Sequence, residues 1–277
     1  MGLLDGKVAI ITGAGGGLGR AYARLLAEEG AAIVVNDFDA EAAGRVVQEI
    51  SELGGGAAGC IADVSTPAGG ELILETALNT FGRVDILINN AGILRDKSFT
   101  NLTEDMWDAV VKVHLKGTYC VTQPVFRWMK DSKQGGVIVN TSSSSGLGGS
   151  FGQTNYGAAK AGIWGFSNSL ALEGRKYGIR VWTLCPAAAT SMTTGLLTEE
   201  MAQQWRPERV APVVLYMVSA LSGDRTNRTL FASGTRIMEL KMVSSSGMRN
   251  RQGLSARDIA AAEGDLFLPD TALSFND

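Results

Sequence analysis

The 277-residue sequence has few of the residues that build metal sites and disulfides. It contains one histidine and three cysteines, Cys60, Cys120 and Cys185. The cysteines are far apart and odd in number, and they form neither a zinc-binding spacing nor a CxxC redox motif. We interpret all three as small core residues and expect no metal.

Strong net charge and long apolar runs are also missing. The net charge is −3, and a nucleic-acid-binding protein would normally present a basic stripe. No apolar run reaches the roughly 18 residues that a membrane span needs. The N-terminal residues lead directly into a strand pattern and have no secretory layout. These absences predict a cytoplasmic protein that binds neither nucleic acid nor a membrane.

What the sequence does have is glycine, with 35 copies, and a regular alternation of strand and helix patterns. The alternation predicts an α/β fold with a single Rossmann-type, doubly wound parallel sheet and helices on both of its faces. The expected strands are 8–11, 32–36, 57–61, 84–88, 137–140 and 179–184, with an edge strand at 230–232. The expected helices are 18–29, 40–53, 67–81, 103–130 and 154–177.

The character of the chain changes after about residue 240, where a polar stretch begins. We predict an NAD-binding and catalytic domain over residues 1–240 and a C-terminal extension over residues 241–277. The extension contains one candidate helix, 255–263. It is either a mobile segment or an arm that packs on the body or on a partner subunit.

A glycine-rich turn joins the first expected strand to the first expected helix. The strict GxGxxG fingerprint fails, because Gly13 and Gly15 are present but Leu18 occupies the third position. The pattern Gly13-xxx-Gly17-x-Gly19 fits instead. The N–H groups of a helix N-terminus attract a pyrophosphate, and glycines allow the backbone to approach it closely. The turn is therefore a candidate cofactor site, and a purely structural turn is the alternative.

An acidic residue ends the second expected strand. Asp37 lies 20 residues beyond Gly17, where a carboxylate accepts hydrogen bonds from the ribose hydroxyls and repels a 2′-phosphate. This position predicts NAD as the cofactor in preference to NADP. The alternative is that Asp37 only caps the helix that begins near Asp39, although Asp39 could do this itself.

A tyrosine and a lysine lie one helical turn apart, at Tyr156 and Lys160. Just upstream, four serines, 142–145, follow an expected strand. Free tyrosine has a pKa of about 10. A nearby lysine and an oxidised nicotinamide both favour the phenolate, so Tyr156 could act as a general base near neutral pH. A serine hydroxyl could hold the substrate oxygen.

Together these residues resemble the short-chain dehydrogenase/reductase family over about residues 5–240. The motifs are Thr12-Gly13-xxx-Gly17-x-Gly19, Asp63-Val64, Asn89-Asn90-Ala91-Gly92, Ser143 placed 13 residues before the tyrosine, and Tyr156-xxx-Lys160. The resemblance implies that Tyr156 is the catalytic acid/base and that Ser143 orients the substrate oxygen. Ser142 replaces Ser143 if the loop is shifted by one residue. Lys160 would bind the nicotinamide ribose and lower the pKa of the tyrosine.

The resemblance also implies a set of cofactor contacts beyond the glycine loop. Asp63 and Val64 would frame the adenine, and Asn90, Ala91 and Gly92 would line the cofactor. Ala189 and Thr190 would lie near the nicotinamide, with Thr190 touching its carboxamide.

Two positions depart from the family pattern. The usual catalytic asparagine is replaced by His114 within Val113-His114-Leu115, and the usual Pro-Gly after the sixth strand is Pro186-Ala187. His114 either keeps a water relay to the lysine or is a packed structural histidine. The turn after Pro186 is open to question.

A narrower similarity concerns the substrate. The stretches TGAGGGLGRAY (12–22), RDKSF (95–99), VHLKG (113–117) and FGQTNY (151–156) are similar to the (3R)-hydroxyacyl-CoA dehydrogenase modules of peroxisomal multifunctional enzymes. This implies interconversion of a 3-hydroxyacyl-CoA and its 3-oxoacyl-CoA. The alternatives are a 3-oxoacyl-[acyl-carrier-protein] reductase, a hydroxysteroid dehydrogenase and, remotely, a non-catalytic NAD-binding regulator.

Several further features bear on the substrate and on assembly. Residues 188–205 are a candidate lid for an acyl or steroid-like substrate, or an ordinary packed helix; its apolar side chains are Met192, Leu196, Leu197, Met201 and Trp205. Basic residues could meet CoA phosphates or be solvated surface groups; they are Arg95, Lys97, Lys112 and Arg127. By analogy with the family, the small-residue stretch 157–172 predicts a homodimer or homotetramer.

Overall fold

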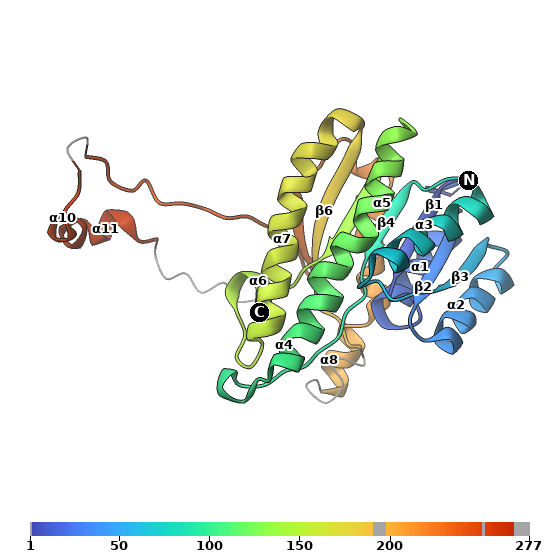
Figure 1. Ribbon diagram of the computed structural model, residues 1–277, viewed down its shortest axis with the longest axis horizontal. Coiled ribbons are helices and arrows are strands. Elements are labelled where there is room, and N and C mark those ends of the chain that lie inside the picture. Colours follow the sequence, from blue (N-terminus) through green and yellow to red (C-terminus); the bar gives the residue numbers. More distant parts are fainter. Residues whose placement is uncertain (1, 191–197, 251–252, 269–277) are drawn as a thin grey trace. The chain divides into compact units, whose positions relative to one another are not determined.

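The structure is a computed structural model that describes residues 2–190, 198–250 and 253–268 (Figure 1). The chain divides into two compact units, Met1–Glu239 and Leu240–Asp277. The larger unit contains nearly all of the sheet. In the smaller unit, helices α10 (Ala256–Ala261) and α11 (Glu263–Leu266) follow one another, and a capping box between Ser255 and Asp258 starts α10. The role predicted for this extension stays a prediction.

One eight-stranded sheet forms the centre of the fold, with the strand order β3-β2-β1-β4-β5-β6-β7-β8. Strands β1 to β7 are joined to their neighbours in parallel. The predicted doubly wound α/β fold is therefore confirmed. The strands are β1 (Val8–Thr12), β2 (Ala32–Asp37), β3 (Ala57–Ile61), β4 (Ile86–Asn89), β5 (Gly136–Thr141), β6 (Ile179–Pro186), β7 (Arg228–Ala232) and β8 (Ile237–Leu240).

Residues 230–232 form a strand as predicted, but the prediction that this strand lies at the edge of the sheet is wrong. That segment belongs to β7, which lies between β6 and β8. Only residues 233–236 connect β7 to β8, and the N–H of Ser233 donates to the carbonyl of Arg236. A connection this short allows a hairpin but no parallel crossover. Strand β8 was missed because its Ile-Met-Glu-Leu sequence is short, and its side chains are exposed or half-buried.

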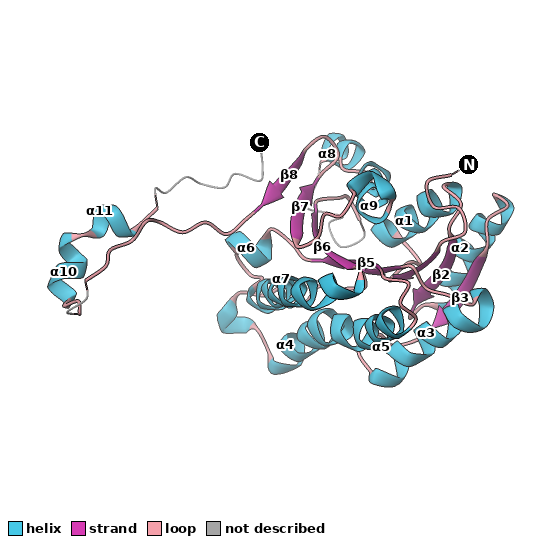
Figure 2. Ribbon diagram, turned by 90° about the horizontal axis from the view of Figure 1, so that it is seen from above, coloured by secondary structure: helices cyan, strands magenta, loops and turns pink. Residues whose placement is uncertain are grey.

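Helices cover both faces of the sheet (Figure 2). One face carries α1 (Gly17–Glu28), α2 (Ala40–Glu52) and α9 (Ala211–Val218); the other carries α3 (Pro67–Phe81), α5 (Gly117–Asp131) and α7 (Thr154–Gly174). The remaining helices of the larger unit are α4 (Glu104–Val111), α6 (Ser145–Gly148) and α8 (Glu199–Gln204). The predicted helix 103–130 is interrupted by a π-helical turn at Lys112–Lys116, which separates α4 from α5.

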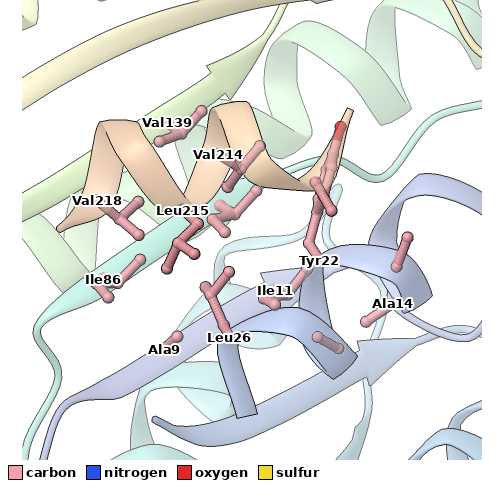
Figure 3. Close-up of a cluster of buried hydrophobic side chains, with 14 of the residues drawn as sticks. Ala9, Ile11, Ala14, Tyr22, Leu26, Ile86, Val139, Val214, Leu215 and Val218 are labelled. Atoms are coloured by element: carbon pink, nitrogen blue, oxygen red, sulfur yellow. The ribbon is translucent and has the colours of Figure 1, made fainter. Parts of the chain in front are cut away.

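The two faces bury two separate apolar cores. In the first, Tyr22 and Leu26 of α1 pack with Val214 and Val218 of α9 over the central strands (Figure 3). In the second, side chains of α3, α5 and α7 pack on the opposite face. Every residue of β1 is buried, which explains why the central strands are apolar throughout instead of alternating. This rigid sheet holds the loops at its carboxyl edge, where ligands bind in open α/β folds.

Candidate active site

A cleft of about 820 Å³ opens at the carboxyl ends of the parallel strands. It brings together most of the residues that the sequence singled out: Gly13, Gly17, Leu18, Asp37, Asp63, Val64, Asn90, Ala91, Gly92, His114, Ser143, Tyr156, Lys160 and Thr190. Three predicted residues do not line the cleft, namely Gly15, Gly19 and Ala189. The sequence reasoning missed Phe38, Leu94 and Gln153, which do line it, whereas Trp205 lines it as one of the predicted lid residues.

The glycine loop is tied to the end of β4. The side chain of Asn90 donates to the carbonyls of Thr12 (3.0 Å) and Gly13 (3.1 Å), and the hydroxyl of Thr12 accepts from two backbone N–H groups. A Cβ atom at Gly19 would overlap the carbonyl oxygen of Gly13 and lie 2.8 Å from the Asn90 amide. Gly19 therefore does not line the cleft itself. Because it has no side chain, α1 can begin close to the end of β4.

The start of α1 suits a phosphate. Its N-cap residue is Gly16, which has no side chain to cap the helix, and the first turn carries no acidic residue. Gly17 has a φ of +50°, a conformation that glycine adopts readily. The first backbone N–H groups of a helix have no partner within the helix. The residues present therefore fit the diphosphate of a dinucleotide.

Asp37 lies at the end of β2 and makes two backbone contacts. One carboxylate oxygen accepts from the N–H of Gly15 at 2.9 Å, and the other accepts from the N–H of Asp39 at 3.1 Å. Asp39 itself caps α2, accepting from the N–H groups of Glu41 and Ala42. A carboxylate has about four acceptor sites, so Asp37 keeps capacity for ribose hydroxyls.

Residues that follow β2 and β3 also line this end of the cleft. The Ser65 hydroxyl and N–H donate to Asp63 at 2.6 and 2.9 Å, and the hydroxyl's hydrogen bond lowers the pKa of Asp63. Val64 is buried beside it. Phe38 is 81% exposed yet lines the cleft, which leaves an aromatic face open to a planar ring.

The catalytic candidates meet where β5 and α7 approach each other. Ser143 and Tyr156 both line the cleft, and the Ser143 side chain lowers the pKa of Tyr156. Lys160 is buried, lies 5.4 Å from the centre of the tyrosine ring, and donates to the carbonyl of Thr141 at 2.6 Å. Ser142 instead donates to the backbone carbonyl of Lys160 at 2.7 Å. The geometry thus turns Ser143 toward the tyrosine and gives Ser142 a structural contact.

Burial controls the electrostatics of this pair. It raises the pKa of Tyr156 to about 12, although the Ser143 side chain opposes the rise. It also lowers the pKa of Lys160 to about 7. Desolvation is the largest cause of the raised pKa of Tyr156 when only protein groups surround the phenol. The lowering expected from the sequence includes the charge of an oxidised nicotinamide.

His114 lies within the π-helical turn and is buried behind Tyr156. The two rings meet edge to face with centroids 5.2 Å apart. Nε2 lies 3.0 Å from the N–H of Ile93 and 2.8 Å from its carbonyl, and Nδ1 is buried without a partner among the described residues. Burial lowers the pKa of His114 to about 3, so the ring is neutral at physiological pH. π-Turns of this kind often occur at functional sites.

The segment after β6 replaces the Pro-Gly of the family pattern. The N–H of Ala187 donates to Ala232 at 2.8 Å, and the N–H of Ala189 donates to Trp205 at 2.6 Å. The backbone contact turns Ala189 away from the cleft, whereas Thr190 and Trp205 line it. Of the candidate lid residues, Met201 is half-buried in α8; those outside the described residues are Met192, Leu196 and Leu197.

The basic residues proposed for CoA phosphates lie in different places. Lys112 lines the cleft. Arg95 and Lys97 are exposed next to the cleft residue Leu94. Arg127 lines a separate pocket between α3 and α5, so the structure does not bring it to the cleft.

Two kinds of feature are absent from the described residues. They contain no group of three or more histidine, cysteine or acidic side chains that could hold a metal ion. No helix in the described ranges has both the length and the apolar character that a membrane crossing requires.

Comparisons with known proteins agree with this site. Residues 7–210 match the family model described as short chain dehydrogenase. The chain is 46% identical to peroxisomal multifunctional enzyme type 2 of Mus musculus over 222 residues, which are 77% of this chain but 30% of that protein. The chain therefore spans about a third of that relative. It is also 38% identical to hydroxyacyl-CoA dehydrogenase ChsB1 of Mycobacterium tuberculosis, covering 84% of this chain and 79% of the relative.

A solved structure is similar in fold and sequence. It is a 7α-hydroxysteroid dehydrogenase complexed with NADH and 7-oxoglycochenodeoxycholic acid, with a TM-score of 0.78 and 31% identity. The match covers 84% of this chain and 94% of that one. The chain thus belongs to the short-chain dehydrogenase family, as its motifs predicted, and is an oxidoreductase that acts on CH–OH groups.

Proposed function

We propose that the protein uses NAD to interconvert a (3R)-3-hydroxyacyl-CoA and its 3-oxoacyl-CoA. The observation that carries the reaction type is the arrangement of Ser143, Tyr156 and Lys160 around one point of the cleft. The narrower substrate assignment is supported by the similarity to a hydroxyacyl-CoA dehydrogenase along most of both chains.

In this proposal Tyr156 exchanges a proton with the substrate oxygen. Ser143 holds that oxygen by a hydrogen bond. Without substrate, the Ser143 side chain instead favours the ionised phenol. Lys160 stays next to the phenol because the carbonyl of Thr141 fixes its ammonium group. When bound, the nicotinamide supplies the hydride acceptor and a positive charge, and that charge opposes the raised pKa of Tyr156.

His114 and its neighbours would keep the tyrosine in place. Its neutral ring packs edge-on against the phenol and is fixed to Ile93. A neutral ring adds no charge to the site. We therefore assign His114 a positioning role beside Tyr156, in the place of the usual asparagine.

The preference for NAD is proposed from the charge of Asp37. Its carboxylate faces the cleft at the end of β2 and is fixed by two backbone N–H groups. It can accept hydrogen bonds from ribose hydroxyls and would repel a 2′-phosphate. The structure with NADH supports a nicotinamide cofactor in a related site.

The test is the rate at which NADH or NADPH forms from a (3R)-3-hydroxyacyl-CoA with NAD or NADP, respectively, with Tyr156→Phe alongside. We expect turnover with NAD, at least 10-fold slower turnover with NADP, and a loss of about 1000-fold or more in kcat in the variant. The matched control is Tyr119→Phe on the exposed face of α5, which should leave the rate unchanged. NAD binding without turnover of any 3-hydroxyacyl-CoA would refute the substrate assignment.

A hydroxysteroid substrate is the second candidate, because the related solved structure holds a steroid-derived ligand. A panel of hydroxysteroids in the same assay separates the two substrate classes. A carrier-protein reductase would favour NADPH, and a non-catalytic regulator would bind NAD without turnover. The predicted dimer or tetramer and the cytoplasmic location stay predictions, and light scattering checks the former.

A further inference from the structure

A chain of side-chain hydrogen bonds runs from the catalytic serine to the outer rim of the cleft. The N–H of Ser145 donates to the Ser143 hydroxyl at 3.2 Å, and the Ser145 hydroxyl donates to Oε1 of Gln153 at 2.9 Å. Nε2 of Gln153 then donates to Oδ2 of Asp96 at 2.7 Å. The chain joins the loop after β4 to the segment before α7, and Gln153 lines the cleft.

The donors and acceptors along this chain can be arranged in one direction only. An ionised carboxylate accepts hydrogen bonds and cannot donate them, so the NH₂ group of Gln153 must face Asp96. The amide oxygen must then face Ser145, whose single hydroxyl hydrogen is directed to it. Ser150, 3.0 Å from the Ser145 hydroxyl, must in turn be the donor to Ser145. The charge of Asp96 therefore determines how the Gln153 amide is oriented.

This orientation leaves one hydrogen for a ligand. A side-chain amide has two N–H hydrogens, and the hydrogen bond to Asp96 engages one of them. Gln153 is the N-cap residue of α7 and precedes Tyr156 by three residues, and both residues line the cleft. The second hydrogen can thus reach an oxygen close to, but different from, the oxygen that Tyr156 and Ser143 hold.

The loop that carries Asp96 is held by contacts of its backbone and not by the Asp96 side chain. The N–H of Lys97 donates to the carbonyl of Gly152 at 2.9 Å, and the buried amide of Asn155 donates to the carbonyl of Arg95 at 3.0 Å. These contacts use the backbone on both sides of Asp96. The exposed carboxylate is thus free to serve Gln153.

We propose that Asp96 is a positioning residue that fixes the Gln153 amide with its NH₂ group at the cleft, and that Gln153 thereby selects substrates with a carbonyl oxygen two carbons from the reacting hydroxyl. The substrate part rests on the proposed function, because a 3-hydroxyacyl thioester has such an oxygen. A secondary alcohol without this oxygen would gain nothing from the amide.

The kinetic test compares two substrates that differ in that oxygen. One is the (3R)-3-hydroxybutyryl thioester of N-acetylcysteamine, and the other is the matching thioether, with CH₂ in place of the carbonyl. We expect the wild type to prefer the thioester at least 10-fold in kcat/KM. In Asp96→Ala the KM for the thioester should rise about 10-fold with little change for the thioether. Asp96→Asn should recover part of the preference, because its amide oxygen can still accept from Gln153.

The ratio of the kcat/KM values for the two substrates separates this positioning role from a general effect on catalysis. The charge of Asp96 also contributes to the raised pKa of Tyr156, but its removal alters both substrates alike and cancels in the ratio. Asp108→Ala, which removes an exposed carboxylate from α4, is the matched control and should keep the wild-type preference. An unchanged preference in Asp96→Ala, or an equal loss for both substrates, would overturn the proposal.

A second measurement decides the positioning role without turnover. In protein labelled with ¹⁵N at glutamine, the side-chain amide of Gln153 is identified by its absence in Gln153→Leu. We expect its hydrogens to exchange at least 10-fold faster in Asp96→Ala than in the wild type and in Asp108→Ala. Equal exchange in all three would overturn the role of Asp96. Wild-type inactivity on both thio-substrates, with slowed amide exchange intact, would instead refute the proposed substrate class.

Discussion

The two ends of the cleft differ in the chemical groups that form their surfaces. At the glycine-loop end, backbone groups of β1 and α1 form the surface, and side chains such as Asn90 serve to hold that backbone. At the catalytic end, buried side chains form the surface, and burial shifts the pKa values of Tyr156, Lys160 and His114. The glycine loop at the first end depends on the absence of side chains, and the second end depends on the charge state of side chains that are present.

The two ends should therefore be sensitive to different changes. A backbone surface is damaged by any added atom, whatever the pH, because the interior cannot make room. A surface of buried ionisable groups tolerates some changes of shape but responds to protonation. Substitutions at the two ends should therefore differ in how their effects depend on pH and on added atoms.

The largest effect is expected for Gly19→Ala. The new Cβ would overlap the carbonyl oxygen of Gly13 and crowd the Asn90 amide, so the start of α1 must move. We expect a loss of NAD affinity of 100-fold or more, which corresponds to about 3 kcal/mol, at every pH from 6 to 9. Calorimetric titration with NAD measures it. Gly44→Ala is the control, since an added Cβ there meets nothing within 4 Å on α2 and should stabilise the helix slightly. A pH-dependent loss would contradict the steric explanation.

The second effect belongs to the catalytic end and is a matter of charge. Because the pKa of Lys160 is lowered to about 7 in the folded protein while the unfolded chain binds the proton up to about pH 10.4, the unfolded state holds more protons between these values. The lysine's contribution to stability therefore rises with pH across that window and is most unfavourable below pH 7. Lys160→Met should stabilise the protein by a few kcal/mol at pH 6, and the gain should shrink toward pH 10.

Thermal unfolding of both proteins from pH 6 to pH 10 checks this prediction. Lys130→Met removes a partly exposed lysine from α5 and should give a nearly constant difference from the wild type. A stability gain in Lys160→Met that grows with pH would show that the ammonium is stabilised in the folded state, against the lowered pKa.

The same contrast explains how much the sequence could predict. The glycine loop, Asp37 and the Tyr156–Lys160 pair follow fixed spacings on regular elements, so their places in the cleft could be read from the order of residues. The π-turn at Lys112–Lys116 could not, because nothing in the local pattern distinguishes it from a continuous helix. The pKa of Tyr156 in the absence of cofactor could not be predicted for a related reason. It depends on how deeply the fold buries the phenol, which no spacing reveals.

Contacts between residues that are far apart in the sequence could not be predicted either. Gln153 and Asp96 are 57 residues apart and meet only because two loops lie at the same edge of the sheet. Strand β8 is held by its pairing with β7 and has little apolar pattern of its own. Such features arise from tertiary contacts, which override weak local preferences.

A third variant places an added atom at the catalytic end. A Cβ at Gly92 would overlap the His114 ring and lie 3.0 Å from its Nδ1. The ring would be pushed toward Tyr156, so we expect kcat to fall about 10-fold, or about 1.4 kcal/mol in the barrier. The smaller side chain in the double variant Gly92→Ala/His114→Asn should restore much of the lost rate. If the double variant is no faster than Gly92→Ala alone, the loss does not come from the histidine.

The smallest effect separates two carboxylates at the glycine-loop end. Asp39 caps α2 with its side chain, whereas Asp37 faces the cleft. Asp39→Ala should lower the free energy of unfolding by about 1 kcal/mol, the usual cost of a lost N-cap, and leave the ratio of NAD to NADP affinities unchanged. Asp37→Ala should leave the free energy of unfolding nearly unchanged. It should lower the ratio of NAD to NADP affinities about 10-fold, because the 2′-phosphate is no longer repelled. Denaturant unfolding and cofactor titration of both variants measure the two quantities side by side. If Asp37→Ala changed only stability, Asp37 would be a helix-capping residue like Asp39, and the preference for NAD would have to come from elsewhere in the cleft.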